Sequence, residues 1–248
     1  MNLLKTSYTF QVSPQSVDFR YKITLPALTD LLLTAAGYNA DENGFGIRTL
    51  QQNNSSWVLL RLAIELHEFP EQYEELSIET WIHDIGRVNT SRNFRIRNNR
   101  QEIIGYAISN WAMIDMQTRR AIDLNSLPTI KACVAGDPVP IEKPAKLGPV
   151  EGEPFEQLKV RYSHIDINQH VNTMRYVEWI SNYFDPVHYT SHQLKRFDIN
   201  FMSELVFGDE VVVTGQSTEQ HEYSFEIKGN NNTSCRARLL FQPIRPSL

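Results

Sequence analysis

A short polar run in the C-terminal half of the chain carries the residue types best suited to chemistry. Asp166, Asn168 and His170 stand at alternate positions between a predicted strand and a predicted helix with an aromatic face. If this stretch is extended, the three side chains point toward one side. A helix start adds unpaired backbone N–H groups and a partial positive charge, which can polarise a carbonyl or bind an oxyanion. The run therefore predicts a site that acts on a carbonyl group.

A structural interpretation accounts for the same three residues. Asp and Asn are common at helix starts because their side chains accept hydrogen bonds from free backbone N–H groups. On this interpretation Asp166 or Asn168 only caps the helix, and His170 is a structural histidine. Composition by itself favours this alternative, so the chemical interpretation needs support from the rest of the chain.

The elements that must position the run form two similar halves, each a helix followed by strands. Helical spacing covers residues 25–36, where Gly37 is expected to end the helix, and residues 176–184, where Asp185-Pro186 is expected to end it. Alternation predicts strands over 76–82, 94–97, 104–108, 197–202 and 211–213. The short connections favour antiparallel meanders and an α+β class.

A proline-rich stretch separates the halves. Six of the twelve prolines fall between Pro128 and Pro154, and proline lacks the backbone donor that helices and sheet interiors need. We expect an N-terminal unit over 1–127, an extended linker over 128–155 and a C-terminal unit over 156–248. Residues 63–76 can be laid over 198–211 without a gap, which indicates a duplicated α+β unit. The helix start of the first half, residues 22–26, contains no Asp, Asn or His.

Bulk properties exclude several classes of protein. The 248 residues are 41% hydrophobic and 21% charged, as in an ordinary globular protein, and a net charge of −5 argues against a nucleic-acid binder. No apolar run approaches the roughly 20 residues that span a bilayer, and the N-terminus lacks a secretory signal. Cys133 and Cys235 lie in no metal-ligand or disulfide pattern. We expect a cytoplasmic protein without membrane insertion, metal or cofactor.

The motif Asp-x-Asn-x-His-Val-Asn, followed by the aromatic stretch 176–180, resembles the signature of the acyl-acyl-carrier-protein thioesterases. These are the plant and bacterial double-hotdog hydrolases. The resemblance covers most of the chain, and only the linker is weak. The other matching segments, in the family's order, are Glu79-Thr80-Trp81-Ile82, Ser91-Arg92-Asn93-Phe94, Ser109-Asn110-Trp111, Thr118-Arg119-Arg120, Asn200-Phe201-Met202-Ser203-Glu204 and Gly208-Asp209.

The resemblance implies both fold and function. It implies two tandem hotdog units, each a long helix packed on an antiparallel sheet, and hydrolysis of a fatty acyl chain from acyl carrier protein in fatty acid biosynthesis. The implied catalytic positions are Asp166, Asn168, His170 and Glu204, all in the C-terminal unit. The N-terminal unit would shape the acyl tunnel. The substrate-binding candidates are Leu28, Leu31, Leu32, Arg92 and Trp179.

Each of these binding candidates has a plainer explanation. Ordinary core packing explains the leucines equally well, and the aromatic stripe that contains Trp179 is typical of a core face. Arg92 belongs to a basic cluster with Arg95, Arg97 and Arg100, which could meet an acidic carrier or pantetheine phosphates. A solvated charged surface is the more common outcome for such a cluster.

One departure from the family bears on mechanism. Many plant members have a cysteine directly after the glutamate, where this chain has Leu205. A thiolate nucleophile is therefore not expected, and attack by water is. Either Glu204 or Asp166 would act as general base with His170 orienting the water, while Asn168 and a backbone N–H would stabilise the oxyanion. The sequence does not choose between the two carboxylates.

Two other functions stay open at this stage. One is an acyl-CoA thioesterase on the same fold, which would differ only in the carrier. The other is a non-catalytic acyl-binding module, against which the complete set of four polar residues argues. A homodimer is a further option that the sequence does not decide.

Overall fold

The computed structural model describes residues 4–244. Two compact units divide the chain, one formed by residues 1–24 with 28–144 and the other by 25–27 with 145–248. The division at Pro144 falls inside the proline-rich stretch. In both units, successive strands such as residues 75–85 with 90–97 and 210–219 with 222–229 pair antiparallel. The short connections between them allow this pairing, whereas parallel strands would need longer crossovers. The expected α+β class is confirmed.

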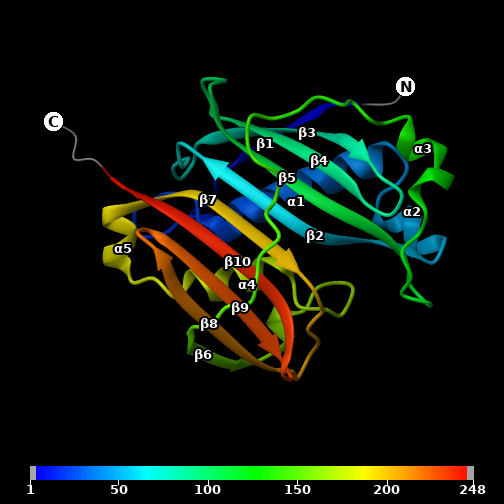
Figure 1. Cartoon of the computed structure of the whole chain (residues 1–248). Helices are drawn as coiled ribbons and strands as arrows, with labels where there is room; N and C mark the ends of the chain where they lie inside the picture. Colours follow the sequence, from blue (N-terminus) through cyan, green and yellow to red (C-terminus); the bar gives the residue numbers. More distant parts are fainter. Residues whose placement is uncertain (1–3, 245–248) are drawn as a thin grey trace. The chain divides into compact units, whose positions relative to one another are not determined.

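The first unit contains a five-stranded antiparallel sheet in the order β1-β3-β4-β5-β2. Its longest helix, α1, lies on this sheet (Figure 1). The strands are β1 (Thr6–Gln11), β2 (Ser55–Leu66), β3 (Glu75–Ile85), β4 (Thr90–Arg97) and β5 (Ile103–Asp115), and the helices are η1 (Pro14–Ser16), α1 (Leu25–Glu42), α2 (Ile47–Gln52), η2 (Leu124–Ser126) and α3 (Pro128–Lys131).

Helix α1 continues beyond the residue expected to end it. Gly37 lies inside the helix, which runs on to Glu42. A glycine in a helix interior costs about 1 kcal/mol relative to alanine. The last turn offsets this cost because Asn39 and Ala40 are buried, at 2% and 7% exposure. Tertiary packing therefore overrides the local stop signal.

The second unit repeats the architecture, with a sheet in the order β7-β10-β9-β8-β6. Its main helix, α4, has only nine residues, so the expected long helix is present in the first unit alone. The strands are β6 (Glu153–Lys159), β7 (His192–Phe201), β8 (Glu210–Glu219), β9 (Glu222–Gly229) and β10 (Asn232–Pro243), and the helices are η3 (Tyr162–His164), α4 (Thr173–Ser181) and α5 (Pro186–Ser191).

The Asp185-Pro186 pair starts a helix as well as following one. Helix α4 already ends at Ser181, and Asp185 is the cap of α5, with its Oδ1 accepting from the N–H of His188 at 2.8 Å. Pro186 occupies the first turn, where its missing N–H costs nothing. The position at which the helix was expected to end therefore lies in the connection between α4 and α5.

The proline-rich stretch is only partly an extended linker. Pro128 opens the short helix α3, and Pro154 lies in β6, which pairs with β8 alone among the described strands. Between them, Trp81 Nε1 donates to the carbonyl of Asp137 at 2.8 Å, within the first unit. In the second unit, Asn200 Oδ1 accepts from the N–H of Leu147 at 3.0 Å. Side chains of each sheet therefore fix the stretch at defined positions.

A buried charged cluster lies on the sheet of the second unit. Asp198 is fully buried and accepts from Arg196 Nε at 2.7 Å and from Arg238 Nη2 at 3.0 Å. Its Oδ1 also accepts from the N–H of Ala145 at 3.1 Å. Burial raises the pKa of Asp198, but the hydrogen bonds and charge of Arg196 outweigh it and the net pKa is lowered. Asp198 therefore neutralises two arginines and anchors the start of this unit.

We predict that Asp198→Asn lowers the free energy of unfolding by about 3 kcal/mol or more, because it leaves the buried Arg196 without its counter-charge. Chemical denaturation at neutral pH measures this. Because the folded pKa is lowered, the carboxylate stabilises the fold above its ordinary pKa and loses that effect as the pH falls. The exposed Glu219 at the end of β8 provides the control Glu219→Gln. Equal stabilities for the two variants would contradict the prediction.

Candidate active site

The polar run singled out by the sequence is a tight turn. The N–H of Asp166 donates to the carbonyl of His170 at 2.8 Å, and the N–H of Gln169 donates to the carbonyl of Asp166 at 3.0 Å. Asp166 Oδ1 accepts from the N–H groups of Asn168 at 2.8 Å and His170 at 3.3 Å. Gln169 has a left-handed φ of 64°. The stretch is therefore not extended, and the alternation that would place the three side chains on one side does not apply to it.

The turn precedes helix α4 and does not cap it. The cap is Asn172, whose Oδ1 accepts from the N–H of Met174 at 3.0 Å. The proposed helix-cap role of Asp166 or Asn168 is therefore also wrong. An Asn directly before a helical pattern is the sequence signal for this cap. Asp166 caps the turn, where its carboxylate replaces backbone partners.

The turn brings His170 against Glu204, which is distant in sequence. His170 Nε2 lies 3.3 Å from Glu204 Oε2. The contact follows from an antiparallel bridge between His170 and Val206, next to a hydrogen bond from the N–H of Val171 to the carbonyl of Leu205 at 2.8 Å. In such a pairing, diagonal neighbours lie on one face. The two side chains are 29% and 35% exposed, so water reaches them.

Neither cysteine is placed to act as a nucleophile. Cys133 and Cys235 are free and buried, at 2% and 0% exposure. Burial raises the pKa of both thiols, which disfavours the thiolate. Leu205, at the position of the plant cysteine, is also buried. These placements agree with the expectation of attack by water.

The first unit contains a copy of the same turn, beginning at Asp18. The N–H of Asp18 donates to the carbonyl of Lys22, and the N–H of Tyr21 donates to the carbonyl of Asp18, both at 2.9 Å. Asp18 Oδ1 accepts from the N–H of Arg20 at 2.8 Å, and Tyr21 has a left-handed φ of 60°. The N–H of Ile23 donates to the carbonyl of Pro70, as that of Val171 does to Leu205. These matching bonds place Asp18 at the position of Asp166.

This copy corrects the comparison of the two halves. The equivalent run is residues 18–22 and not 22–26, so the first half does contain the aspartate. The loop after β2 also matches in detail, because Glu74 Oε2 accepts from the N–H of Glu71 at 2.8 Å and Asp209 Oδ2 accepts from the N–H of Val206 at 2.9 Å. The gapless overlay of residues 63–76 on 198–211 therefore reflects real structural equivalence.

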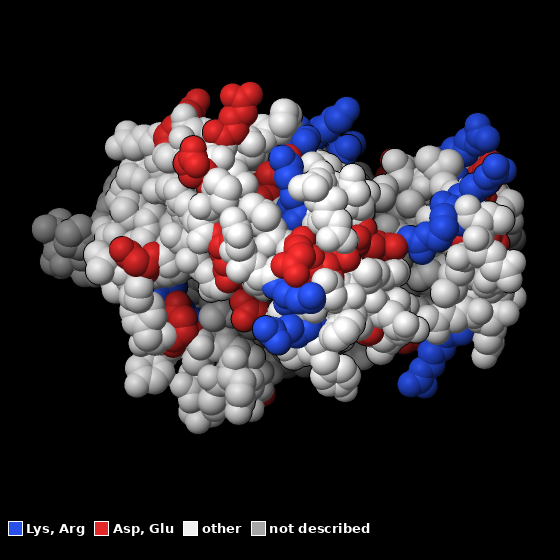
Figure 2. All heavy atoms as spheres, turned by 90° about the horizontal axis from the view of Figure 1, so that it is seen from below, with Lys and Arg blue, Asp and Glu red and all other residues white. Residues whose placement is uncertain are grey.

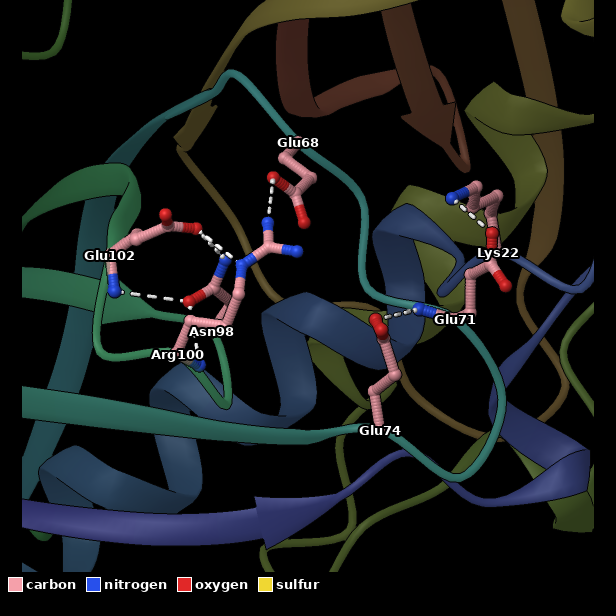
Figure 3. Close-up of polar contacts among 7 residues, drawn as sticks. All are labelled: Lys22, Glu68, Glu71, Glu74, Asn98, Arg100 and Glu102. Atoms are coloured by element: carbon pink, nitrogen blue, oxygen red, sulfur yellow. Dashed lines mark hydrogen bonds and ion pairs between the residues drawn. The ribbon is translucent and has the colours of Figure 1, made fainter.

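The two copies differ in the residues that would do chemistry. Lys22 occupies the position of His170, Arg20 that of Asn168, and Phe69 that of Glu204. Figure 3 shows that Lys22 Nζ forms an ion pair with Glu71 Oε1, at 2.7 Å, while Glu74 accepts from the backbone of Glu71. The aspartate alone is common to both turns, so it builds the turn. The His–Glu pair is specific to the second unit.

The expected substrate-binding residues lie in several places. Leu28 and Leu32 are fully buried on α1, and Leu31 is partly buried. Trp179 is 4% exposed on α4, with its ring edge-to-face with that of His164 at 5.5 Å. Trp179 also lines an open groove of about 690 Å³ along β6 and α4, whose lining includes none of the four catalytic candidates.

The four arginines do not form a free basic surface. Arg92 is 5% exposed and donates from Nη1 to Asn39 Oδ1 at 2.8 Å, and burial lowers its pKa to about 10. Arg95 is paired with Glu79 at 2.7 Å, and Arg97 donates to the carbonyl of Gln101 at 2.9 Å. Arg100 is paired with Glu102 and Glu68, as Figure 3 shows. On the face drawn in Figure 2, some of the Lys and Arg side chains lie beside Asp or Glu side chains.

Residues 4–244 contain no group of three or more His, Cys, Asp or Glu side chains arranged to hold a metal ion. Within that same range no helix is long and apolar enough to cross a membrane.

Comparison with known proteins identifies the family. The profile of the acyl-ACP thioesterase N-terminal domain matches residues 4–126, and that of the C-terminal domain matches residues 149–243. The chain belongs to the acyl-ACP thioesterase family. This confirms the resemblance and the expected class of activity, thioester hydrolysis.

Individual relatives of the chain agree with this assignment. The crystal structure of an acyl-ACP thioesterase from Bacteroides thetaiotaomicron has a TM-score of 0.91 at 38% identity, covering 96% of this chain and 98% of that one. The 12:0-ACP thioesterase from Umbellularia californica has a TM-score of 0.85 at 21% identity, covering 97% of this chain and 98% of that one, which supports the fold. Oleoyl-acyl carrier protein thioesterase 2 from Arabidopsis thaliana is 25% identical over 92% of this chain and 67% of its own length.

The duplicated turn generates a prediction that separates folding from catalysis. Asp166→Ala and Asp18→Ala should each lower the free energy of unfolding by about 1–2 kcal/mol, because each removes the carboxylate that caps its turn. Only Asp166→Ala should also lower kcat, because only that turn carries a His–Glu pair. Denaturant titration and steady-state hydrolysis of an acyl thioester measure the two effects. An equal loss of kcat in both variants would contradict this assignment.

Proposed function

We propose that the second unit hydrolyses the thioester of a fatty acyl chain on acyl carrier protein, using water as the nucleophile. The observation that supports this most directly is the 3.3 Å contact between His170 Nε2 and Glu204 Oε2, at a half-exposed position. A carboxylate beside an imidazole is a common arrangement for activating a hydroxyl or water. The products are the free fatty acid and the thiol of the carrier.

The reaction proceeds through one tetrahedral intermediate. Glu204 accepts a proton from water that His170 orients, and the water oxygen bonds to the thioester carbon. The Asn168 amide and a backbone N–H near the start of α4 stabilise the oxyanion. The intermediate collapses with cleavage of the C–S bond, and the proton passes from Glu204, through His170, to the departing sulfur. No covalent acyl-enzyme forms.

Glu204 suits the role of base better than Asp166. Asp166 Oδ1 already accepts two backbone hydrogen bonds within the turn, at 2.8 and 3.3 Å. Asp18 accepts a backbone hydrogen bond from the N–H of Arg20 in the equivalent turn of the first unit, where Lys22 stands in place of His170. An aspartate that the bare fold requires is a positioning residue. Glu204 has Phe69 as its counterpart, so the fold itself does not require a carboxylate there.

The first unit supplies the pocket for the acyl chain in this proposal. Leu28, Leu31 and Leu32 on α1 are the candidate apolar contacts. Trp179 stays a candidate in the second unit. Arg92 is buried beside Asn39, so any part it plays is inside the first unit and not on a surface for an acidic carrier. A cytoplasmic location, a role in fatty acid biosynthesis and a homodimer stay predictions from the sequence.

We predict that Glu204→Gln and His170→Ala each lower kcat by ~10²–10⁴, the usual range for general-base assistance. Asn168→Ala should lower kcat by about 10²–10³, as loss of one oxyanion donor does. Combining Glu204→Gln with His170→Ala should cost little beyond the larger single effect, because the two residues act as a unit. Single-turnover hydrolysis of an acyl-carrier-protein thioester measures all four variants.

Glu210→Gln is the matched control for Glu204→Gln. Glu210 is an exposed carboxylate at the start of β8, ion-paired with Lys159 at 3.4 Å, and its loss should leave kcat unchanged. Near-normal rates in all three single variants would refute the assignment. Parallel assays with the same acyl group on coenzyme A distinguish an acyl-CoA thioesterase. Retention of acyl ligand without hydrolysis would indicate a binding module.

A further inference from the structure

Tyr176, near the start of α4, is buried beside the loop that carries Glu204. The side chain is 3% exposed. Its ring stands edge-to-face with that of Phe201, the last residue of β7, at a centroid distance of 5.5 Å. Glu204 follows Phe201 by three residues in the loop after that strand. A buried hydroxyl costs free energy unless it has hydrogen-bond partners, so the surroundings of this phenol decide its role.

The hydroxyl of Tyr176 lies beside the backbone that follows Glu204. Burial raises the pKa of Tyr176 above its ordinary value, and the charge of Glu204 raises it further. A hydrogen bond from the backbone of Leu205 lowers the pKa in turn, as a donor to the phenol oxygen does. Leu205 is 1% exposed, so this bond supplies a partner for a backbone N–H that water does not reach.

Leu205 is therefore held from two sides. Its carbonyl accepts from the N–H of Val171 at 2.8 Å, which ties it to the turn that precedes α4. Its N–H is tied to α4 itself through Tyr176. That N–H belongs to the planar peptide group joining Glu204 to Leu205, so the hydroxyl restrains the backbone from which the Glu204 side chain extends. The carboxylate of Glu204 lies 3.3 Å from His170 Nε2.

The first unit lacks both members of this interaction. Leu28 occupies the position of Tyr176, since each is the fourth residue of its helix. Pro70 occupies the position of Leu205, because its carbonyl accepts the equivalent backbone bond, from the N–H of Ile23. Leucine has no hydroxyl and proline has no backbone N–H. The fold is built in the first unit without this bond, and the hydroxyl and its donor occur together in the unit that carries the His–Glu contact.

We propose that Tyr176 is a positioning residue for the hydrolysis, which fixes the backbone at Glu204 through the bond between its hydroxyl and the N–H of Leu205. This proposal rests on the proposed function, in which Glu204 is the base. A general base must lie within about 2.6–3.2 Å of the water that it deprotonates. A misplacement of about 1 Å can cost on the order of 10²-fold in rate. Release of the Leu205 peptide therefore slows the chemical step and leaves substrate binding unchanged.

Tyr176→Phe tests this role because it removes the hydroxyl and keeps the buried ring. We expect kcat to fall about tenfold, as for the loss of one hydrogen bond, and KM to stay within about twofold of the parent value. Steady-state hydrolysis of an acyl-carrier-protein thioester measures both. Rates are normalised to the folded fraction, which near-ultraviolet circular dichroism measures. A residue that only supports the fold would leave the normalised kcat unchanged.

Tyr183→Phe is the matched control. Tyr183 lies beyond the end of α4, where its ring packs against Phe155 at 4.9 Å and Phe225 at 5.1 Å, and its variant should keep the parent kcat. Combining Tyr176→Phe with Glu204→Gln gives a second readout. Because no base is left to position, this double variant should match Glu204→Gln within about twofold.

Four results would overturn the positioning role. They are a parent kcat in Tyr176→Phe, a rise of KM in place of a fall of kcat, an equal loss of kcat in Tyr183→Phe, and a further loss of about tenfold in the double variant. If the parent protein does not hydrolyse the acyl-carrier-protein thioester, the proposed function itself fails. If the parent is active, Glu204→Gln is impaired and Tyr176→Phe matches the parent, only the positioning role fails.

Discussion

The candidate site depends on one backbone contact between two loops that are distant in sequence. The N–H of Val171 donates to the carbonyl of Leu205, and this bond sets the register in which His170 faces Val206 and reaches Glu204. A shift of one residue would turn one of the two side chains to the opposite face. The turn at Asp166 and the loop after β7 therefore act as a pair, and neither forms a site by itself.

The duplicated architecture separates what the fold needs from what the chemistry needs. Both units close the same turn with an aspartate, Asp18 in the first and Asp166 in the second. His170, Asn168 and Glu204 belong to the second unit, and the equivalent positions of the first unit hold Lys22, Arg20 and Phe69. In the first unit Lys22 pairs with Glu71, which stands at the position of Val206, and Phe69 stands at that of Glu204. One scaffold thus holds a His–Glu contact in one copy and a Lys–Glu ion pair in the other.

Exposed apolar side chains stand beside the duplicated turn in both units, with Phe19, Tyr21 and Tyr73 in the first and Ile167, Val206 and Phe207 in the second. The buried charged residues of the second unit stabilise its fold. Asp198 neutralises Arg196 and Arg238 and holds the backbone of Ala145, so it serves the integrity of the second unit and not its chemistry.

The sequence by itself determined the α+β class, the duplication, most strands and the family, because these follow from periodicity and ordered motifs that span the chain. The resemblance also predicted Asp166, Asn168, His170 and Glu204 as catalytic residues, of which the structure brings His170 and Glu204 into contact. The sequence pattern misjudged the end of α1, where buried packing outweighs the glycine. It did not reveal the turn at residues 166–170, which depends on side-chain capping and a left-handed residue. Only the tertiary structure decided which residues meet, because the contact between His170 and Glu204 depends on a backbone register that no local pattern encodes.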